Sequence, residues 1–204
     1  MRSEDWDAKF GASEFLFTDK PNQTVAAEVA ALPPGSALDL AAGQGRNAVW
    51  LAQQGWDVTA VDFSPVGLDR ARRLAAANDV DVTFVLADVL TWQPQRACYD
   101  LVLISYLQLP AGQLRSVLNG AVAALAPGGT LLVIGHDRDN LTRGYGGPQD
   151  GDVLYSVDDL LGAVAGLRVE KAGQIDRVVD TELGPFTAID TLVRAARPIA
   201  EDAS

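Results

Sequence analysis

The sequence contains few of the residues from which metal centres and disulfides are built. Its 204 residues include one cysteine, Cys98, and one histidine, His136. A single cysteine excludes an internal disulfide and a cysteine-based zinc cluster. No apolar run reaches the length of about 18 residues that a membrane span needs, and residues 1–10 lack the basic and then apolar regions of a secretory signal. We therefore expect a cytoplasmic protein with no metal site and no membrane partner.

Positive charge is also scarce. Lys and Arg number 16 against 27 Asp and Glu, which gives a formal net charge of -11. Binding to a phosphate backbone depends on Lys and Arg, so nucleic acid is disfavoured as a partner. The local group Arg70, Arg72 and Arg73 is interpreted as a solvated helix face. The sequence also has no G-x-S-x-G elbow and no G-x4-G-K-[ST] loop, which disfavours α/β hydrolases and P-loop enzymes.

The length of the chain leaves room for one domain with a substantial core. An apolar share of 48% and a charged share of 21% are typical of soluble globular proteins. We expect a single domain at residues 21–197, preceded by an aromatic arm or lid at residues 1–20 and followed by a free tail at residues 198–204.

The most informative stretch runs from Ala37 to Ser64. It contains, in order, a buried strand at residues 36–40, a turn with Gly43 and Gly45, a helix at residues 47–53 and a second strand at residues 58–62. Glycines let the backbone come close to a ligand, and the following helix N-terminus supplies free N–H groups. The pattern predicts a ligand-binding β-turn-α-β unit.

Two ligand classes use such a unit. Residues 43–48 fit the dinucleotide pattern G-x-G-x-x-G/A, with Asp62 where a ribose-binding acid belongs. Asp39, however, lies at the mouth of the turn, where a carboxylate would repel a pyrophosphate and attract an ammonium. S-adenosylmethionine (SAM) carries an ammonium and a sulfonium at one end, so the charge pattern favours SAM. An NAD(P)-binding oxidoreductase and a non-catalytic module that binds SAM or its product S-adenosylhomocysteine (SAH) are the alternatives.

The run from Asp39 to Gly45, DLAAGQG, resembles the first motif of the class I (Rossmann-like) SAM-dependent methyltransferases, an acidic residue followed by x-G-x-G-x-G. Ala41 replaces the first glycine, which is tolerable if φ there is negative. Residues 43–47 and the following WLAQQGWDVTAVDFS are similar to small bacterial methyltransferases of the tellurite-resistance and thiopurine type. The resemblance covers roughly residues 5 to 195.

The resemblance implies a three-layer α/β fold with a mostly parallel seven-stranded sheet and a C-terminal antiparallel hairpin. The pattern of the chain agrees with it. Further strands are expected at residues 82–86, 99–106 and 130–135, helices at 23–32, 65–78, 111–125 and 157–164, and the two hairpin strands at 167–179 and 185–194.

The cofactor site is expected at the carboxyl ends of the strands. We assign Asp39 to the methionine ammonium side, Gly43 and Gly45 to close backbone approach, and Asp62 to the ribose hydroxyls. In the family the corner at Asp88 holds the adenine. The other cofactor-binding residues that the resemblance implies are Ala41, Arg46, Asn47, Phe63, Ser64, Ala87, Val89, Ser105 and Phe17.

The aromatic arm has two interpretations. Trp6, Phe10, Phe15 and Phe17 either pack as a satellite cluster on the domain or form a lid over cofactor and substrate. Phe17 is the best lid candidate, because a sulfonium and an aromatic face attract each other as a cation and a π system do.

Methyl transfer from a sulfonium is an in-line displacement that needs neither a metal nor a covalent nucleophile. We expect a small-molecule acceptor and a substrate loop at residues 136–153, a long polar segment after a strand. His136 either acts as general base on a thiol, phenol or hydroxyl, or only hydrogen-bonds within the loop. Tyr106 could place its ring edge or its hydroxyl beneath the methyl group. The acceptor atom (S, O, N or a chalcogen) and the oligomeric state stay open.

Five other residues of this loop are candidates for substrate polarity. They are Asp137, Arg138, Asp139, Arg143 and Tyr145.

Overall fold

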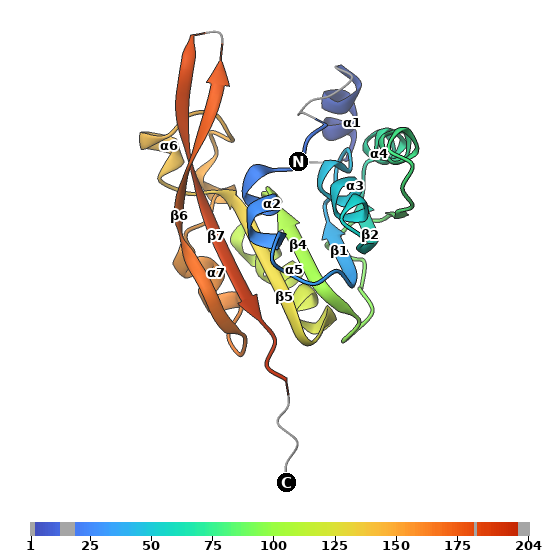
Figure 1. The fold of residues 1–204 in the computed structure, drawn as a ribbon. Helices are drawn as coiled ribbons and strands as arrows, with labels where there is room; N and C mark the ends of the chain where they lie inside the picture. The colour runs from blue at the N-terminus through green and yellow to red at the C-terminus, as the bar shows by residue number, and fades with distance from the viewer. Residues whose placement is uncertain (1–2, 13–18, 182, 200–204) are drawn as a thin grey trace.

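A seven-stranded sheet forms the centre of the computed structural model, which describes residues 3–12, 19–181 and 183–199 (Figure 1). The strand order is β3-β2-β1-β4-β5-β7-β6. The strands are β1 (Ser36–Leu40), β2 (Asp57–Asp62), β3 (Thr83–Leu86), β4 (Tyr99–Ser105), β5 (Leu125–His136), β6 (Arg168–Thr181) and β7 (Gly184–Ala196). Strands β1 to β5 are parallel, and β7 is antiparallel to both β5 and β6. The expected mostly parallel sheet with a closing hairpin is confirmed.

Local sequence signals start the main helices. Ser64 caps α4 by accepting the Gly67 N–H, and Pro65 occupies the first helical position. Ser156 and Asp159 form a reciprocal capping box at the start of α7. The helices are α1 (Ser3–Ala12), α2 (Gln23–Val29), α3 (Arg46–Gln53), α4 (Pro65–Ala77), α5 (Ala111–Ala124), α6 (Asn140–Arg143) and α7 (Val157–Ala163), with a 3-10 turn at Gly151–Val153.

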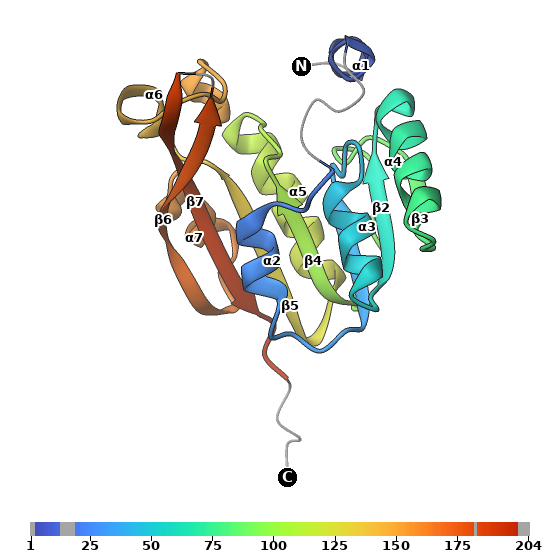
Figure 2. The same ribbon diagram turned by 45° about the horizontal axis from the view of Figure 1, so that its top comes forward.

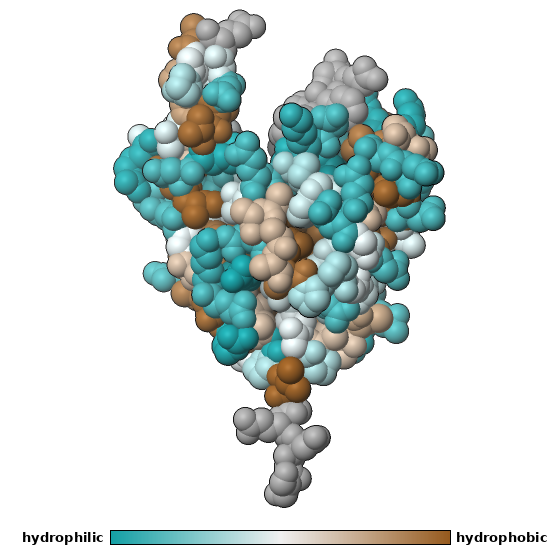
Figure 3. Space-filling model, viewed as in Figure 1, coloured by the Kyte–Doolittle hydropathy of each residue, from teal (hydrophilic) through white to brown (hydrophobic). Residues whose placement is uncertain are grey.

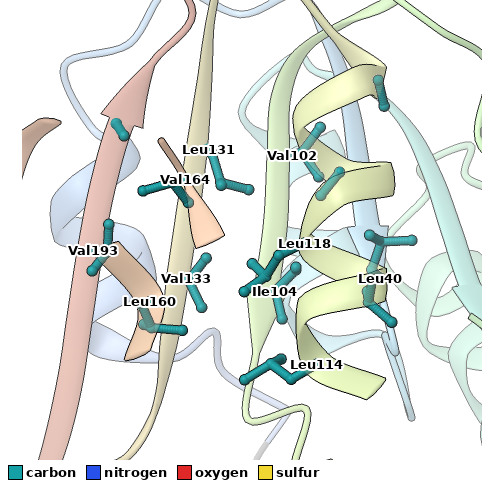
Figure 4. Packing of buried hydrophobic residues seen from close by; sticks show 14 of the residues in the cluster. Leu40, Val102, Ile104, Leu114, Leu118, Leu131, Val133, Leu160, Val164 and Val193 are labelled. Carbon is teal, nitrogen blue, oxygen red and sulfur yellow. The ribbon is translucent and has the colours of Figure 1, made fainter. Parts of the chain in front are cut away.

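The sheet is covered on both faces. Along β4, Leu101 and Leu103 pack with residues of α2 and α3, whereas Val102 and Ile104 pack with residues of α5 and α7. Figure 4 shows the second layer, in which the side chains of α5 and α7 point into the strands. Since both faces are dry, β4 is apolar at consecutive positions, as expected for a central parallel strand.

The closing hairpin continues beyond the rest of the sheet. The last β5–β7 pair is His136 with Asp190, but the β6–β7 ladder runs on to Thr181 and Gly184. The far end of the hairpin and α1 lie at the end of the molecule toward which β4 points (Figures 1 and 2). The space-filling view shows the hairpin end standing clear of the body (Figure 3). Hairpin and arm therefore lie at the end where the strands finish.

Three segments differ from the expectations. Residues 3–12 form α1, which has Glu4 and Asp5 in its first turn and Lys9 in its last turn, a distribution that suits the helix dipole. The loop at 136–153 contains α6 and a 3-10 turn. Strand β5 begins at Leu125 rather than Thr130, because a register shift after the pair Tyr99–Leu125 absorbs the Pro-Gly-Gly segment. None of the described helices has the length and apolar character needed to cross a membrane.

Candidate cofactor and acceptor site

The carboxyl ends of β1, β2 and β4 meet where the strand order reverses. Strand β1 lies between β2 and β4, so the chain leaves it on one side and returns on the other. Open α/β sheets bind ligands at such a switch point. Asp39, Asp62 and Ser105 all lie within the last two residues of these strands. The fold therefore gathers the predicted cofactor residues at one edge.

The turn after β1 is left-handed at three positions. Ala41, Gly43 and Gly45 have φ values of 61°, 56° and 78°. The condition under which alanine would be neutral at position 41, a negative φ, is not met, so Ala41 takes the conformation of the glycine it replaces at a cost of roughly 1–2 kcal/mol. The reason is that Ala42 must turn back for its N–H to reach the carbonyl of Val61 at 3.0 Å.

Gly45 is required by the packing of two helices as well as by its φ. A Cβ at this position would lie 2.6 Å from the Cβ of Ala71 in α4. Gly45 therefore permits the close contact between α3 and α4, and its approach to a ligand stays a prediction. Such an approach places the N-termini of both helices next to the glycine turn.

Asp62 fastens the turn to the end of β2. Its two carboxylate oxygens accept the N–H groups of Gly43 and Ser64, each at 2.8 Å. Burial raises the pKa of Asp62, and these backbone hydrogen bonds act against the rise. Because a carboxylate offers about four lone-pair positions, two more donors can be accepted, which is compatible with ribose hydroxyls.

Asp39 is a buried acid without a full set of hydrogen-bond partners. It is 1% exposed, and its Oδ2 has no hydrogen-bond partner among the described residues. Burial and the neighbouring Asp62 raise the pKa of Asp39 to about 7, while Arg46 and a backbone hydrogen bond from Ala48 lower it. A cation placed at Oδ2 would relieve this cost.

Arg46 and Asn47 begin α3 next to the turn. The Asn47 Oδ1 accepts the N–H of Asn22 at 2.9 Å and so ties the start of α2 to the site. Burial lowers the pKa of the Arg46 guanidinium, as does the nearby Arg177, while Asp39 raises it. Arg46 therefore lies between the Asp39 side and the hairpin side of the site.

The corner predicted for adenine is built mainly from backbone hydrogen bonds. Ala87 donates its N–H to the carbonyl of Asp62 at 2.9 Å, so the ends of β2 and β3 are joined. The Asp88 Oδ1 accepts the Leu90 N–H at 2.9 Å, which makes it a turn residue. Phe63 and Val89 are half-buried at the same corner. The adenine assignment of Asp88 stays a prediction.

Helix α1 lies over the glycine turn. The Ser64 hydroxyl donates to Asp7, and the buried Phe10 ring faces two glycines, because a Cβ on Gly43 or Gly67 would lie 3.3 or 3.1 Å from it. The rings of Trp6 and Phe10 are 5.3 Å apart. Helix α1 is thus packed on the glycine turn, which is compatible with both interpretations of the arm. Phe15 and Phe17 lie outside the described residues.

A second polar cluster surrounds Tyr106, which follows β4 with a φ of 57°. Its hydroxyl donates to the Oδ2 of Asp190 at 2.5 Å and accepts from the Nε of Arg177 at 2.9 Å and the Nδ2 of Asn22 at 3.3 Å. Burial and the nearby Asp190 raise the pKa of Tyr106. The hydroxyl is therefore fully engaged and protonated, so of the two predicted contacts only the ring remains for an acceptor.

His136, at the end of β5, joins the same cluster. Its Nδ1 lies 3.1 Å from the Oδ1 of Asp190, and its ring centroid is 5.0 Å from that of Tyr106. The two predicted catalytic residues are therefore neighbours. His136 is held by a strand partner, which differs from the alternative of a hydrogen bond within its own loop.

The polar residues of the loop face elsewhere. Asp137 is buried, accepts from Thr191 and from the Nε2 of Gln174, and so lies on the other face of the sheet from His136. Arg138 pairs with Asp159 at 3.0 Å. Arg143 pairs with Asp139, and the Tyr145 ring stacks on Phe186 at 4.3 Å. These contacts brace the loop, and they do not bring the five side chains to His136.

Sequence reasoning missed three members of the acceptor side, namely Asn22, Arg177 and Asp190. The available signal was Asp190 itself, a charged residue inside the apolar run AIDTLV. A buried charge in a strand implies a partner. Its partner Arg177 lies 13 positions earlier, on the other hairpin strand.

Comparison with known proteins finds similarity to methyltransferases. Residues 37–129 match the family model described as a methyltransferase domain. A demethylmenaquinone methyltransferase from Thermus thermophilus is 35% identical over 103 residues, which is 50% of this chain and 47% of the relative. The chain spans about half or less of the length of the first curated relatives that it matches.

Solved structures share the fold over nearly the whole chain. One, from work on the conversion of a disulfide bond into a thioacetal group during echinomycin biosynthesis, aligns with a TM-score of 0.76 and 24% identity over 98% of this chain and 94% of the other. TehB from Haemophilus influenzae aligns with a TM-score of 0.74 and 17% identity over 94% and 67% of the two chains.

The seven-stranded sheet with its antiparallel closing hairpin is the arrangement of the Rossmann-like methyltransferases, and residues 37–129 match a methyltransferase domain. The predicted fold is confirmed, and the family model and the curated relatives agree with the predicted methyltransferase family and its cofactor SAM.

Proposed function

We propose that this protein transfers the methyl group of SAM to a small-molecule acceptor by in-line displacement, without a metal. The observation that carries the proposal is the unpartnered, buried Oδ2 of Asp39 at the switch point of the sheet. Leaving a carboxylate buried without a partner costs energy, and the ammonium of SAM is a cation of the right sign to offset that cost.

The chain's own residues hold the rest of the cofactor in this proposal. Asp62 accepts the ribose hydroxyls with its free lone pairs, and the corner at Ala87, Asp88 and Val89 surrounds the adenine. Arg46 lies near the methionine end. Each charge-assisted hydrogen bond contributes roughly 1.5–3 kcal/mol. When SAM is bound, it supplies an activated methyl group, so the protein mainly positions the acceptor and excludes water, which can contribute about 7–11 kcal/mol.

The acceptor enters from the hairpin side, where Tyr106 and His136 border the end of β4. A small acceptor is supported by the names of curated relatives, among them demethylmenaquinone methyltransferase. The non-catalytic SAM-binding module remains the second candidate, because the Tyr106 hydroxyl is fully used within the protein. The NAD(P) oxidoreductase is disfavoured by Asp39 and by the closing hairpin.

A labelled-methyl screen tests the proposal. SAM with a labelled methyl group is incubated with the protein and, separately, with thiols, phenols, hydroxy compounds, carboxylic acids, amines and inorganic chalcogen anions. We expect transfer to one class, abolished in Asp62→Ala and kept in the control Asp69→Ala on the exposed face of α4. Tight SAM binding without transfer to any class would instead support the non-catalytic module.

A further inference from the structure

The two carboxylate oxygens of Asp190 have different neighbours. It is fully buried in β7. Its Oδ2 accepts from the Tyr106 hydroxyl and from the Nε of Arg177 at 2.7 Å, so the guanidinium already balances its charge. Its Oδ1 lies 3.1 Å from the Nδ1 of His136, and neither of these two buried atoms makes a hydrogen bond with proper geometry to any described residue. His136 is therefore not needed to neutralise Asp190.

This pairing selects one form of the neutral imidazole. If Nδ1 carried a lone pair, two acceptor atoms would face each other in a buried place, which is unfavourable. The favourable form of the neutral ring therefore carries its proton on Nδ1, next to Oδ1. The lone pair of the neutral ring is then on Nε2, which makes Nε2 a proton acceptor.

The surroundings leave room beside Nε2. No described residue hydrogen-bonds to Nε2, and it is not among the buried atoms that lack a partner. Gly147 lies next to it with a φ of +76°, and a Cβ there would be 2.9 Å from Nε2. Glycine at this position keeps the nitrogen accessible. The Tyr106 ring, 5.0 Å away, connects the imidazole with the end of β4, where the cofactor edge begins.

We infer that Asp190 positions His136 as the general base, and that the acceptor is a group that must lose a proton, namely a thiol, phenol or hydroxyl. This inference rests on the proposed function. In the reaction the acceptor atom forms a bond to the methyl carbon as the carbon–sulfur bond of SAM breaks. The acceptor proton passes to Nε2, SAH leaves as a neutral sulfide, and the imidazolium is paired with the Asp190 carboxylate.

The single histidine of the chain makes the first test direct. In protein labelled with 15N-histidine, at a pH where the ring is neutral, we expect one imidazole with Nδ1 protonated and Nε2 bare. Asp190→Asn should shift the ring toward the Nε2–H form, because the asparagine amide can donate to Nδ1. Asp176→Asn, an exposed carboxylate on the neighbouring strand, is the control and should leave the spectrum unchanged. A wild-type ring protonated mainly on Nε2 overturns the inference, and this result needs no variant.

A second readout separates positioning from structure. On the acceptor found by the labelled-methyl screen, Asp190→Asn is expected to lower kcat by about 100-fold to 10,000-fold with the KM for SAM unchanged. Unchanged kcat, or transfer only to amines, carboxylic acids or chalcogen anions, overturns the inference. Thermal stabilisation by SAH is measured on the same samples. If wild type shows the Nδ1–H ring but SAH does not bind, the proposed function fails and the geometry of His136 stands.

Discussion

Asp39 and Asp190 are both buried at the end of the molecule where the strands finish, yet their surroundings move their pKa values in opposite directions. Burial raises the pKa of Asp39 to about 7. Burial also acts to raise the pKa of Asp190, but hydrogen bonds with His136, Arg177 and Tyr106 outweigh it and hold the value below the ordinary one. Contacts within the protein therefore stabilise the ionised form of Asp190, whereas the ionised form of Asp39 is stabilised only when a cation binds.

Asp39→Asn is predicted to stabilise the protein without cofactor. The pKa of Asp39 is about 7 in the folded protein and 3.8 in the unfolded chain, so from about pH 4 to pH 7 the unfolded chain has released a proton that the folded chain keeps. Asp39 thus lowers the free energy of unfolding increasingly as the pH rises, and it has no effect below about pH 4. Denaturant unfolding should show a gain for Asp39→Asn of up to about 4 kcal/mol at pH 8, and none at pH 4.

The control for this experiment is Asp57→Asn, an exposed carboxylate at the start of β2. It should change stability little at either pH. A lower stability of Asp39→Asn at pH 8 would contradict the account of Asp39. Calorimetry should show weaker SAM binding by Asp39→Asn, since the ammonium loses its charged partner.

Ala41→Gly is predicted to raise the free energy of unfolding by up to about 1 kcal/mol, because glycine relieves the left-handed strain at φ 61°. The greater conformational entropy of glycine in the unfolded chain offsets part of this gain. Ala42→Gly, at the next position without a positive φ, should instead lose about 0.5–1 kcal/mol. Urea unfolding of both variants gives the comparison. Equal losses in the two variants would mean that position 41 is not strained.

Among the elements, α1 is the one whose role depends on the ligand. It packs on the glycine turn through Phe10 and on the cap of α4 through Asp7. If α1 closes over bound cofactor, SAH should slow tryptic cleavage after Lys9 by severalfold. Cleavage after the exposed Arg96, in the loop before β4, should keep its rate. Equal rates at Lys9 with and without SAH would leave the arm as a packed satellite.

Elements that depend on local signals could be predicted from the sequence. Helix-capping residues indicate the start of α4 at Ser64-Pro65 and the start of α7 at Ser156, and an apolar run indicates β4. Helix α1 could not be predicted, because its apolar residues have no period and Phe10 is buried by contacts with distant glycines.

The site divides in the same way. The cofactor edge lies within one stretch, Ala37 to Ser64, so its motif could be read directly. The acceptor side joins Tyr106 to Asp190, which are 84 positions apart, and to Arg177 on β6. That meeting depends on the strand order β5-β7-β6 and on its register, which no local pattern sets. A charged residue within an apolar strand, such as Asp190, can be recognised in the sequence, but the residue with which it pairs cannot.

In the whole molecule, α1 packs on the glycine turn and His136 pairs with Asp190 of the hairpin. Helix α1 and the far end of the hairpin lie at the same end of the molecule (Figures 1 and 2). The chain has a formal net charge of -11, and Arg46 and Arg177 supply positive charge within the site. Such an arrangement suits a cationic cofactor at Asp39 and a small acceptor at the hairpin side better than a phosphate polymer.

Thermal unfolding of the purified protein with SAM, SAH and NADH in parallel shows which cofactor binds at Asp39. A ligand that binds only the folded state at about a hundred times its dissociation constant stabilises it by about 2.7 kcal/mol, which raises the unfolding temperature measurably. We predict stabilisation by SAM and SAH and none by NADH, with the effect of SAM reduced in Asp39→Asn. Stabilisation by NADH alone would contradict the account and assign the glycine turn to a dinucleotide.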